Sequence, residues 1–179
     1  RIISGEEEAK LSFIGASSSV EVSRGVLTDI GGGSSEVVII DQKKVIKSTS
    51  LAIGSLSAFN DYVDNLFVDK NEKQLIDDQV KKLLEKNKMY REDHDLLCAV
   101  GGSARASLKF YNDYYDEPSS NTSMDSDKLN SMLKEIIDRD FKSNLDSILS
   151  VKADRIHTLL PGMVILNRLS KYFYCKQIN

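Results

Sequence analysis

Three consecutive glycines, Gly31, Gly32 and Gly33, separate two apolar runs that are rich in β-branched residues. The runs cover residues 26–30 and 36–40, and this pattern predicts two strands joined by a tight turn. Because glycine lacks a Cβ, such a turn can bring its backbone N–H groups close to a ligand. Successive N–H groups that face inward form a concave anion site, which suits phosphate.

Two acids flank the glycine turn, Asp29 just before it and Glu36 just after it. Carboxylates are the hard oxygen ligands that Mg²⁺ uses when it bridges a protein and a phosphate. The turn matches neither of two common phosphate motifs. The chain has no G-x-x-x-x-G-K-[ST] sequence, and the residues after the turn continue as a strand instead of opening a helix as G-x-G-x-x-G does.

Composition limits the possible partners of the chain. Its 179 residues, 41% hydrophobic and 28% charged, suffice for one globular domain with a sizeable core. The net charge of −3 leaves no concentrated basic surface, so we expect no nucleic-acid partner. No apolar run approaches the roughly 20 residues that span a bilayer, so we expect no membrane partner. Cys98 and Cys175 lack a metal-binding spacing, which favours buried free thiols and a reducing, cytoplasmic location.

The pattern along the chain predicts a set of strands followed by helices. Short connections join the strands expected at 26–30, 36–40 and 45–50, so these must be antiparallel neighbours. A further buried strand is expected at 96–100, followed by a small-residue turn at 101–104. The helices are expected near 4–15, 55–67, from 70 onward, from 104 to about 111, 129–137, 143–149 and 161–174.

This order resembles a ribonuclease-H-like half-domain of the α/β class, in which a mixed sheet with antiparallel hairpins is flanked by helices. In that architecture the first hairpin carries a phosphate loop at its tip. The strand–glycine–strand turn is similar to the phosphate hairpin of the actin, hexokinase and heat-shock ATPase superfamily. A plain glycine-rich hairpin is the alternative.

Separated motifs, read together, resemble the exopolyphosphatase/guanosine pentaphosphate phosphohydrolase family. Their order and spacing agree over roughly residues 1–169. The matches are residues 2–11 with "ISGxEEAxL", 28–36 with "DIGGGSTE", 51–55 with "LPxGxxRL", 99–104 with a second glycine turn, and 152–156 with 160–162 as "RADxxxPG". In the last motif Lys152 stands where we expect the family's arginine, which puts a bidentate phosphate contact there in doubt.

The resemblance implies roles for particular residues. It makes Glu8 the catalytic base that activates water, with Glu7 as the second candidate; alternatively, these acids only complement the dipole of their helix. It makes Asp29 and Glu36 the ligands of Mg²⁺ or another divalent cation. The phosphate-binding residues that it implies are Gly31, Gly32, Gly33, Ser34, Ser35, Gly101, Gly102 and Ser103; a purely structural second turn is the alternative for the last three.

Family members also carry an earlier half-domain with its own phosphate loop, and no such motif occurs here. Together with a start at Arg1, this predicts that residues 1–179 form a single domain, the C-terminal half of a two-half-domain module. The N-terminal half-domain is then its partner in forming the cleft. We expect this chain alone to be weak or inactive, and a homodimer of the full-length protein stays open.

The resemblance implies a hydrolase of phosphoanhydride bonds. Its substrate would be inorganic polyphosphate, guanosine pentaphosphate (pppGpp), which it would convert to ppGpp, or both. Two alternatives stay open: a related kinase or ATPase, and a non-catalytic (p)ppGpp-binding regulatory module. Of the histidines, His94 is expected at the surface and His157 in helix packing.

Overall fold

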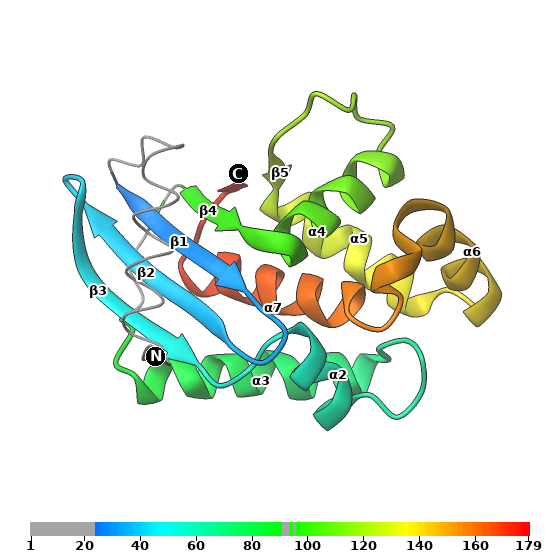
Figure 1. Cartoon of the computed structure of the whole chain (residues 1–179), viewed down its shortest axis with the longest axis horizontal. Helices are drawn as coiled ribbons and strands as arrows, with labels where there is room; N and C mark the ends of the chain where they lie inside the picture. The colour runs from blue at the N-terminus through cyan, green and yellow to red at the C-terminus, as the bar shows by residue number, and fades with distance from the viewer. Residues whose placement is uncertain (1–23, 91–93, 95) are drawn as a thin grey trace.

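The computed structural model describes residues 24–90, 94 and 96–179, and the expected helix at 4–15, with Glu7 and Glu8, lies outside them. A mixed six-stranded sheet has the order β3-β2-β1-β4-β6-β5 (Figure 1). Its strands are β1 (Gly25–Ile30), β2 (Ser35–Asp41), β3 (Lys44–Leu51), β4 (Leu96–Val100), β5 (Met124–Asp125) and β6 (Gln177–Ile178).

The pairing confirms the predicted antiparallel strands. β1 pairs with β2 and β2 with β3 in antiparallel register, whereas β4 is parallel to β1. Asp29 lies directly opposite Glu36 in the β1–β2 register. Directly opposed residues of an antiparallel pair project from the same face of the sheet, so both carboxylates belong to one face.

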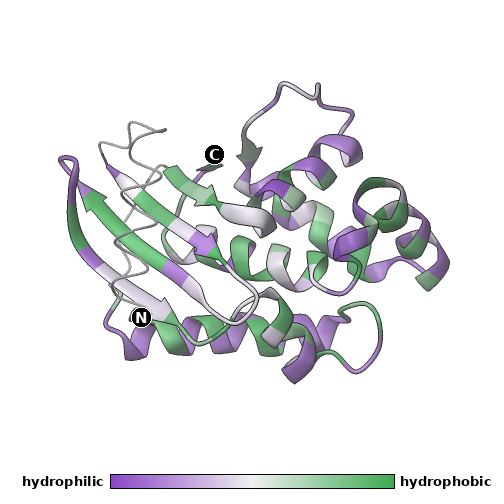
Figure 2. Cartoon of the chain, in the orientation of Figure 1, coloured by the Kyte–Doolittle hydropathy of each residue, from purple (hydrophilic) through white to green (hydrophobic). Residues whose placement is uncertain are grey.

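The helices pack around a buried central helix, α7 (Leu159–Tyr172). The others are α2 (Ser55–Tyr62), α3 (Lys70–Lys86), α4 (Gly101–Tyr114), α5 (Ser126–Asp138) and α6 (Phe141–Lys152), with the short 3₁₀ helix η1 (Ala153–Arg155). α7 contacts α2, α3, α4 and α5, and Figure 1 shows it running through the middle of the helical layer. Figure 2 shows apolar residues along the strands and α7, and polar residues on the outer helices.

Side chains of the sheet divide between two clusters. Val26, Ile30, Val37 and Ile39 join the main core with the helices, whereas Leu27, Val38, Ile40 and Cys98 form a smaller cluster on the other face. Since side chains alternate along a strand, Asp29 and Glu36 project on the face of this smaller cluster.

Several helix boundaries differ from the predictions. The helix that begins at Ser55 ends at Tyr62 instead of near residue 67. The helix expected at 143–149 covers Phe141–Lys152, because Asp140 caps it and accepts from the Ser143 N–H at 3.0 Å. The predicted capping box of α3 is confirmed, with Glu72 N–H donating to Asp69 and Asp69 N–H donating to Glu72, both at 2.8 Å.

The prediction for His94 is wrong, and the prediction for His157 is confirmed in its packing contact but not in its helical position. His94 is buried instead of lying at the surface, and its backbone N–H donates to the Phe173 carbonyl at 3.0 Å. His157 lies in the turn between η1 and α7, not on a helix, and is exposed, with its ring edge-on to Phe59 at 4.9 Å.

The predicted thiol state is confirmed, because Cys98 and Cys175 are both free and buried. Burial raises the pKa of the Cys98 thiol, which disfavours the reactive thiolate. Within the described residues, no helix combines the length and apolar character that crossing a bilayer requires.

Replacing Leu166 of α7 by alanine is expected to reduce the free energy of unfolding by about 2–5 kcal/mol, because its side chain is fully buried in the core. Leu75→Ala on α3 is the matched control, since Leu75 is 54% exposed and its loss should change stability by no more than about 0.5 kcal/mol. Urea unfolding measures both variants. Equal losses would contradict the central position of α7.

Candidate functional site

The glycine turn between β1 and β2 is held by the start of α2. Ser55 N–H donates to the Gly31 carbonyl at 2.8 Å, and the N–H groups of Leu56 and Ser57 both donate to the Gly32 carbonyl at 2.9 Å. The first N–H groups of a helix have no partner within the helix itself. The glycine carbonyls supply these partners, so the turn and α2 form one unit.

The same arrangement leaves donors of the turn available to a ligand. Gly31 N–H donates to the Ser34 carbonyl at 2.9 Å, which closes the turn. Within the described part of the chain, the N–H groups of Gly32, Gly33 and Ser34 donate to no backbone carbonyl. Gly32 and Gly33 are exposed, and a Cβ added at Gly33 would meet nothing within 4 Å. This turn can therefore present several N–H groups to an anion.

Gly54 sets how closely α2 approaches the turn. A Cβ at this position would lie 2.6 Å from the Gly31 carbonyl oxygen and from the carbonyl carbon and oxygen of Gly32. These atoms belong to backbone carbonyls that already accept hydrogen bonds from α2, so they cannot move aside without breaking the contact between the turn and α2. Only glycine fits there.

Glu36 lies beneath the turn in a polar setting. The residue is 4% exposed, and its Oε1 accepts hydrogen bonds from the hydroxyls of Ser34 and Ser50, each at 2.9 Å. These donors hold the carboxylate in place opposite Asp29. Both hydroxyls use Oε1, so with respect to residues 24–90, 94 and 96–179 the Oε2 atom is left for another ligand.

The second glycine turn meets Asp29 where β4 passes into α4. The helix begins at Gly101 itself, whose φ of +88° is a conformation that side chains with a Cβ rarely adopt. A Cβ at Gly101 would also overlap Asp29 Oδ1. The missing side chain therefore lets the carboxylate of Asp29 lie against the N-terminus of α4, where the helix dipole favours negative charge.

Arg155 is a site residue that the sequence prediction missed. Its Nη2 lies 2.5 Å from where a Cβ of Gly102 would be, so the guanidinium rests on the start of α4. Lys152, the residue expected at the arginine position, pairs with Asp154 at 3.0 Å, and the Arg155 Nε also lies 3.9 Å from that carboxylate. The hydrogen bond from Lys152 is the main cause that lowers the pKa of Asp154. The arginine of this turn is thus Arg155, not Lys152.

The spacing of the motif could have identified Arg155. In "RADxxxPG" the arginine precedes the glycine by seven positions, and Arg155 precedes Gly162 by seven, whereas Lys152 precedes it by ten. Gly162 lies under the site, since a Cβ there would be 3.4 Å from Ser55 Cβ and 3.5 Å from Ser103 Cβ. Residues 152–154 of the proposed match fall outside this spacing.

Two serines among the expected phosphate ligands have hydroxyls that are engaged in the fold. Ser35 Oγ donates to the Ile53 carbonyl at 2.7 Å, and Ser103 Oγ donates to the Ile30 carbonyl at 2.7 Å. Both residues are buried. This geometry favours a structural role for their side chains, which tie the ends of the strands to the following segments.

The structure gathers the remaining candidates at one edge of the sheet, where β1 and β4 end and β2 begins (Figure 1). Asp29, Glu36 and the two glycine turns meet there, with Arg155 against the second turn. In the described part of the chain, no three His, Cys, Asp or Glu side chains gather as a group that could hold a metal. Glu8 and Glu7 lie outside the described residues.

A mixed sheet, a glycine hairpin between its first strands and a helix that begins at a second glycine turn define a mixed α/β fold in which helices flank the sheet. Comparison with known proteins gives the family. The model of the Ppx/GppA phosphatase family matches residues 1–179, and the chain therefore belongs to this family.

Solved structures share the fold. An Aquifex aeolicus family member superimposes with a TM-score of 0.79 at 17% identity, over 99% of this chain and 58% of that protein. An exopolyphosphatase from Cytophaga hutchinsonii gives a TM-score of 0.78 at 17% identity, over 98% of this chain and 59% of that one. A curated Haemophilus influenzae protein that is named as an exopolyphosphatase is 24% identical over 99% of this chain. This chain spans 54% of that relative's length.

Substituting Gly54 by alanine is expected to destabilise the protein by about 1–3 kcal/mol, because the new methyl group would displace the glycine turn from α2. Gly33→Ala is the control within the same unit, since its Cβ meets open space and its φ is not in the left-handed region. We expect the control to change stability by no more than about 0.5 kcal/mol. Thermal unfolding compares them, and a tolerated Gly54→Ala would contradict the close packing at this junction.

Proposed function

We propose that this chain forms the phosphate- and metal-binding wall of a phosphohydrolase that releases terminal phosphate from inorganic polyphosphate. One observation carries the proposal above the others. The N–H groups of Gly32, Gly33 and Ser34 are free of backbone acceptors in the described chain, and they lie beside the opposed carboxylates Asp29 and Glu36.

The two carboxylates suit a divalent cation. They project from the same sheet face, and Glu36 keeps Oε2 available because Ser34 and Ser50 both bond Oε1. Mg²⁺ usually takes one or two carboxylates and completes its octahedron with water and substrate phosphate. When bound, the cation would neutralise phosphate charge and orient the terminal group. Asp29 and Glu36 would hold it next to the glycine turn.

Arg155 would act on the phosphate from the side of the second turn. A guanidinium can donate two parallel hydrogen bonds to phosphate oxygens. Its position on Gly102 places it at the N-terminus of α4, so the arginine and the helix dipole contribute positive potential together. Gly101 and Gly102 would contribute backbone N–H groups at the same point.

Glu8 would be the base, a role that rests on the family resemblance. In the step we propose, a water oxygen attacks the terminal phosphorus, and the bridging P–O bond breaks. The proton of the water passes to the Glu8 carboxylate, and the shortened chain leaves with the bridging oxygen. Glu7 is the second candidate for this proton transfer.

We further propose that the cleft is completed by the half of the relatives that this chain does not span. The solved relatives are covered to only 58% and 59% of their length. Half-domains of this kind enclose the substrate between them, so activity would require both walls. Comparing phosphate release by this chain alone with release by the full-length protein tests this, and full activity of the chain alone would refute it.

Polyphosphate is our first choice of substrate, and pppGpp is the second candidate. Phosphate release from each, measured side by side with Mg²⁺ present and after chelation, separates them. ATP binding without phosphate release from either would instead support a kinase or ATPase. Binding of guanosine tetraphosphate without turnover would support a regulatory module.

Glu8→Gln in the full-length protein is expected to lower kcat for phosphate release by about 10²–10⁴-fold, because the amide cannot accept the proton. Glu85→Gln is the control, since this exposed glutamate lies on α3. An unchanged kcat in a folded Glu8→Gln variant would reject Glu8 as the base. If only Glu7→Gln lowered kcat, Glu7 would be the base.

Arg155→Lys in the full-length protein is expected to raise the KM for polyphosphate and lower kcat/KM by about tenfold, because a lysine cannot donate the two parallel hydrogen bonds. Lys152→Arg is the comparison, and it should leave kcat/KM near the wild-type value since Lys152 pairs with Asp154. Steady-state phosphate release measures both. If kcat/KM changed in Lys152→Arg and not in Arg155→Lys, the phosphate contact would be assigned to position 152.

A further inference from the structure

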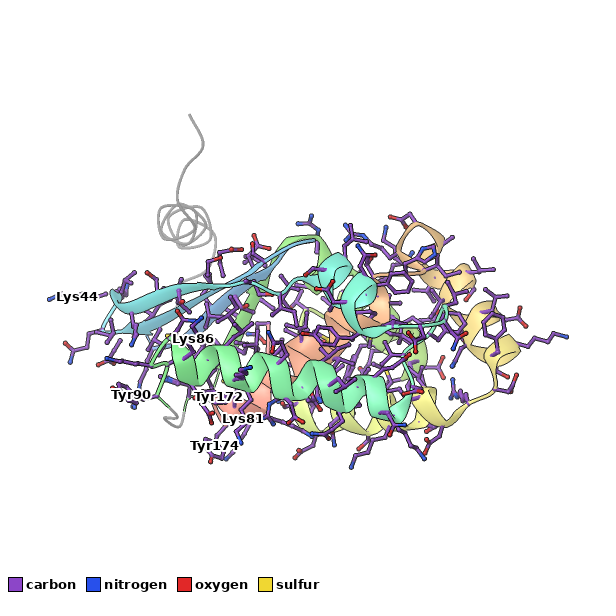
Figure 3. The ribbon with its side chains drawn as sticks, turned by 90° about the horizontal axis from the view of Figure 1, so that it is seen from below. Lys44, Lys81, Lys86, Tyr90, Tyr172 and Tyr174 are labelled. Atoms are coloured by element: carbon purple, nitrogen blue, oxygen red, sulfur yellow. The ribbon has the colours of Figure 1, made fainter. Side chains whose placement is uncertain are left out.

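A second cluster of charge lies on the helical side, between α3 and α5. A pocket of about 310 Å³ opens there, lined by Lys70, Lys73, Lys134, Ile137 and Asp138. In the view of Figure 3, α3 runs along the near face, and the α5 ribbon lies beside its first turns. The glycine turns contact α2 and α4, so this pocket is a separate feature of the molecule.

Lysines from three helices converge at this pocket. Lys70 and Lys73 of α3 and Lys134 of α5 line the pocket. Lys171 of α7 lies beside it and is not a lining residue: its Nζ donates to Asn130, one helical turn before Lys134 on α5, and it feels the charges of Lys73 and Lys134. Burial first, and then these two ammonium groups, lower the pKa of Lys171. Like charges that are held together in this way repel, and an anion between them would relieve the repulsion.

The carboxylates nearby neutralise only part of this charge. Lys70 pairs with Asp138 at 2.8 Å, and Lys73 pairs with Asp77. Asp77 attracts Lys171 as well, as does Asp127 in the first turn of α5.

Among the described residues, the ammonium groups of Lys134 and Lys171 form no ion pair with a carboxylate. Lys171 Nζ donates to the neutral amide oxygen of Asn130. Within the described part of the chain, Lys134 forms no ion pair. Lys134 thus keeps its ammonium group for an external anion, and Lys171, which has three N–H donors, uses one of them on Asn130.

Helix energetics does not explain this cluster. Lys70 is the first residue of α3, where a cation opposes the positive end of the helix dipole. The chain as a whole carries a net charge of −3, so general attraction of anions is not expected either. A local concentration of lysines on an acidic protein points to a local ligand.

We propose that the pocket between α3 and α5 is a second anion site, which binds an inorganic condensed phosphate through Lys134 in its lining and Lys171 beside it. Lysine binds phosphate as a point charge, and several lysines suit a flexible polyanion. None of the five lining residues is aromatic, so the pocket offers no surface on which a nucleotide base could stack. The choice of a condensed phosphate rests on the proposed function.

Calorimetric titration of the full chain with sodium triphosphate tests the site. The double variant Lys134→Gln/Lys171→Gln is expected to weaken binding by at least about tenfold at moderate salt. Lys82→Gln/Lys142→Gln is the charge-matched control, because both lysines are exposed on other surfaces of α3 and α6. The control should retain wild-type affinity, and thermal unfolding checks that both double variants are folded.

Further arms separate this proposal from the proposed function. Side-chain ¹⁵N signals of Lys134 and Lys171 should shift on addition of triphosphate, in wild type and in Asp29→Asn alike. If Asp29→Asn abolishes binding and the lysine variant does not, the glycine turn is the only site and this proposal fails. If both double lysine variants lost the same affinity for triphosphate, the effect would be one of net charge, and the proposal would be overturned. GTP binding much more tightly than triphosphate would overturn the inorganic ligand.

Discussion

The hydrogen bonds between α2 and the glycine turn are the interaction on which the site depends. A helix N-terminus and a glycine-rich turn each attract anions on their own. Here the first N–H groups of α2 are occupied by the carbonyls of Gly31 and Gly32. The helix therefore holds the turn through these hydrogen bonds, and the N–H groups that can meet an anion are those of the turn and not those of the helix. Gly54 makes this exchange possible by allowing backbone to approach backbone.

Glycines at the N-terminus of α4 allow charged groups to approach the helix closely. Gly101 leaves room for the Asp29 carboxylate, and Gly102 leaves room for the Arg155 guanidinium. A carboxylate and a guanidinium thus reach the same turn of α4 from different parts of the chain. Their opposite charges suit the proposed site, which would hold both a cation and a phosphate.

The sequence predicted the parts of the fold that local patterns control. The antiparallel strands around the glycine turn and the capping box at Asp69 follow from periodicity and cap chemistry, and the structure confirms both. The burial of His94 and the contact of Arg155 with Gly102 could not be predicted this way, because packing between distant segments determines them. The structure likewise reveals that the hydroxyls of Ser35 and Ser103 are occupied.

Gly162 connects the packing of the core helix α7 to the position of the two glycine turns. The start of α7 touches Ser55 of α2 and Ser103 of α4 through a position that has no side chain. The spacing between the two helices that carry the glycine turns is therefore set from below, by the thickness of α7. Substitutions that repack this helix would widen or narrow the mouth of the site without altering any residue in it. The packing of α7 and the separation of the two glycine turns are thus coupled, and a change in one is expected to require a change in the other.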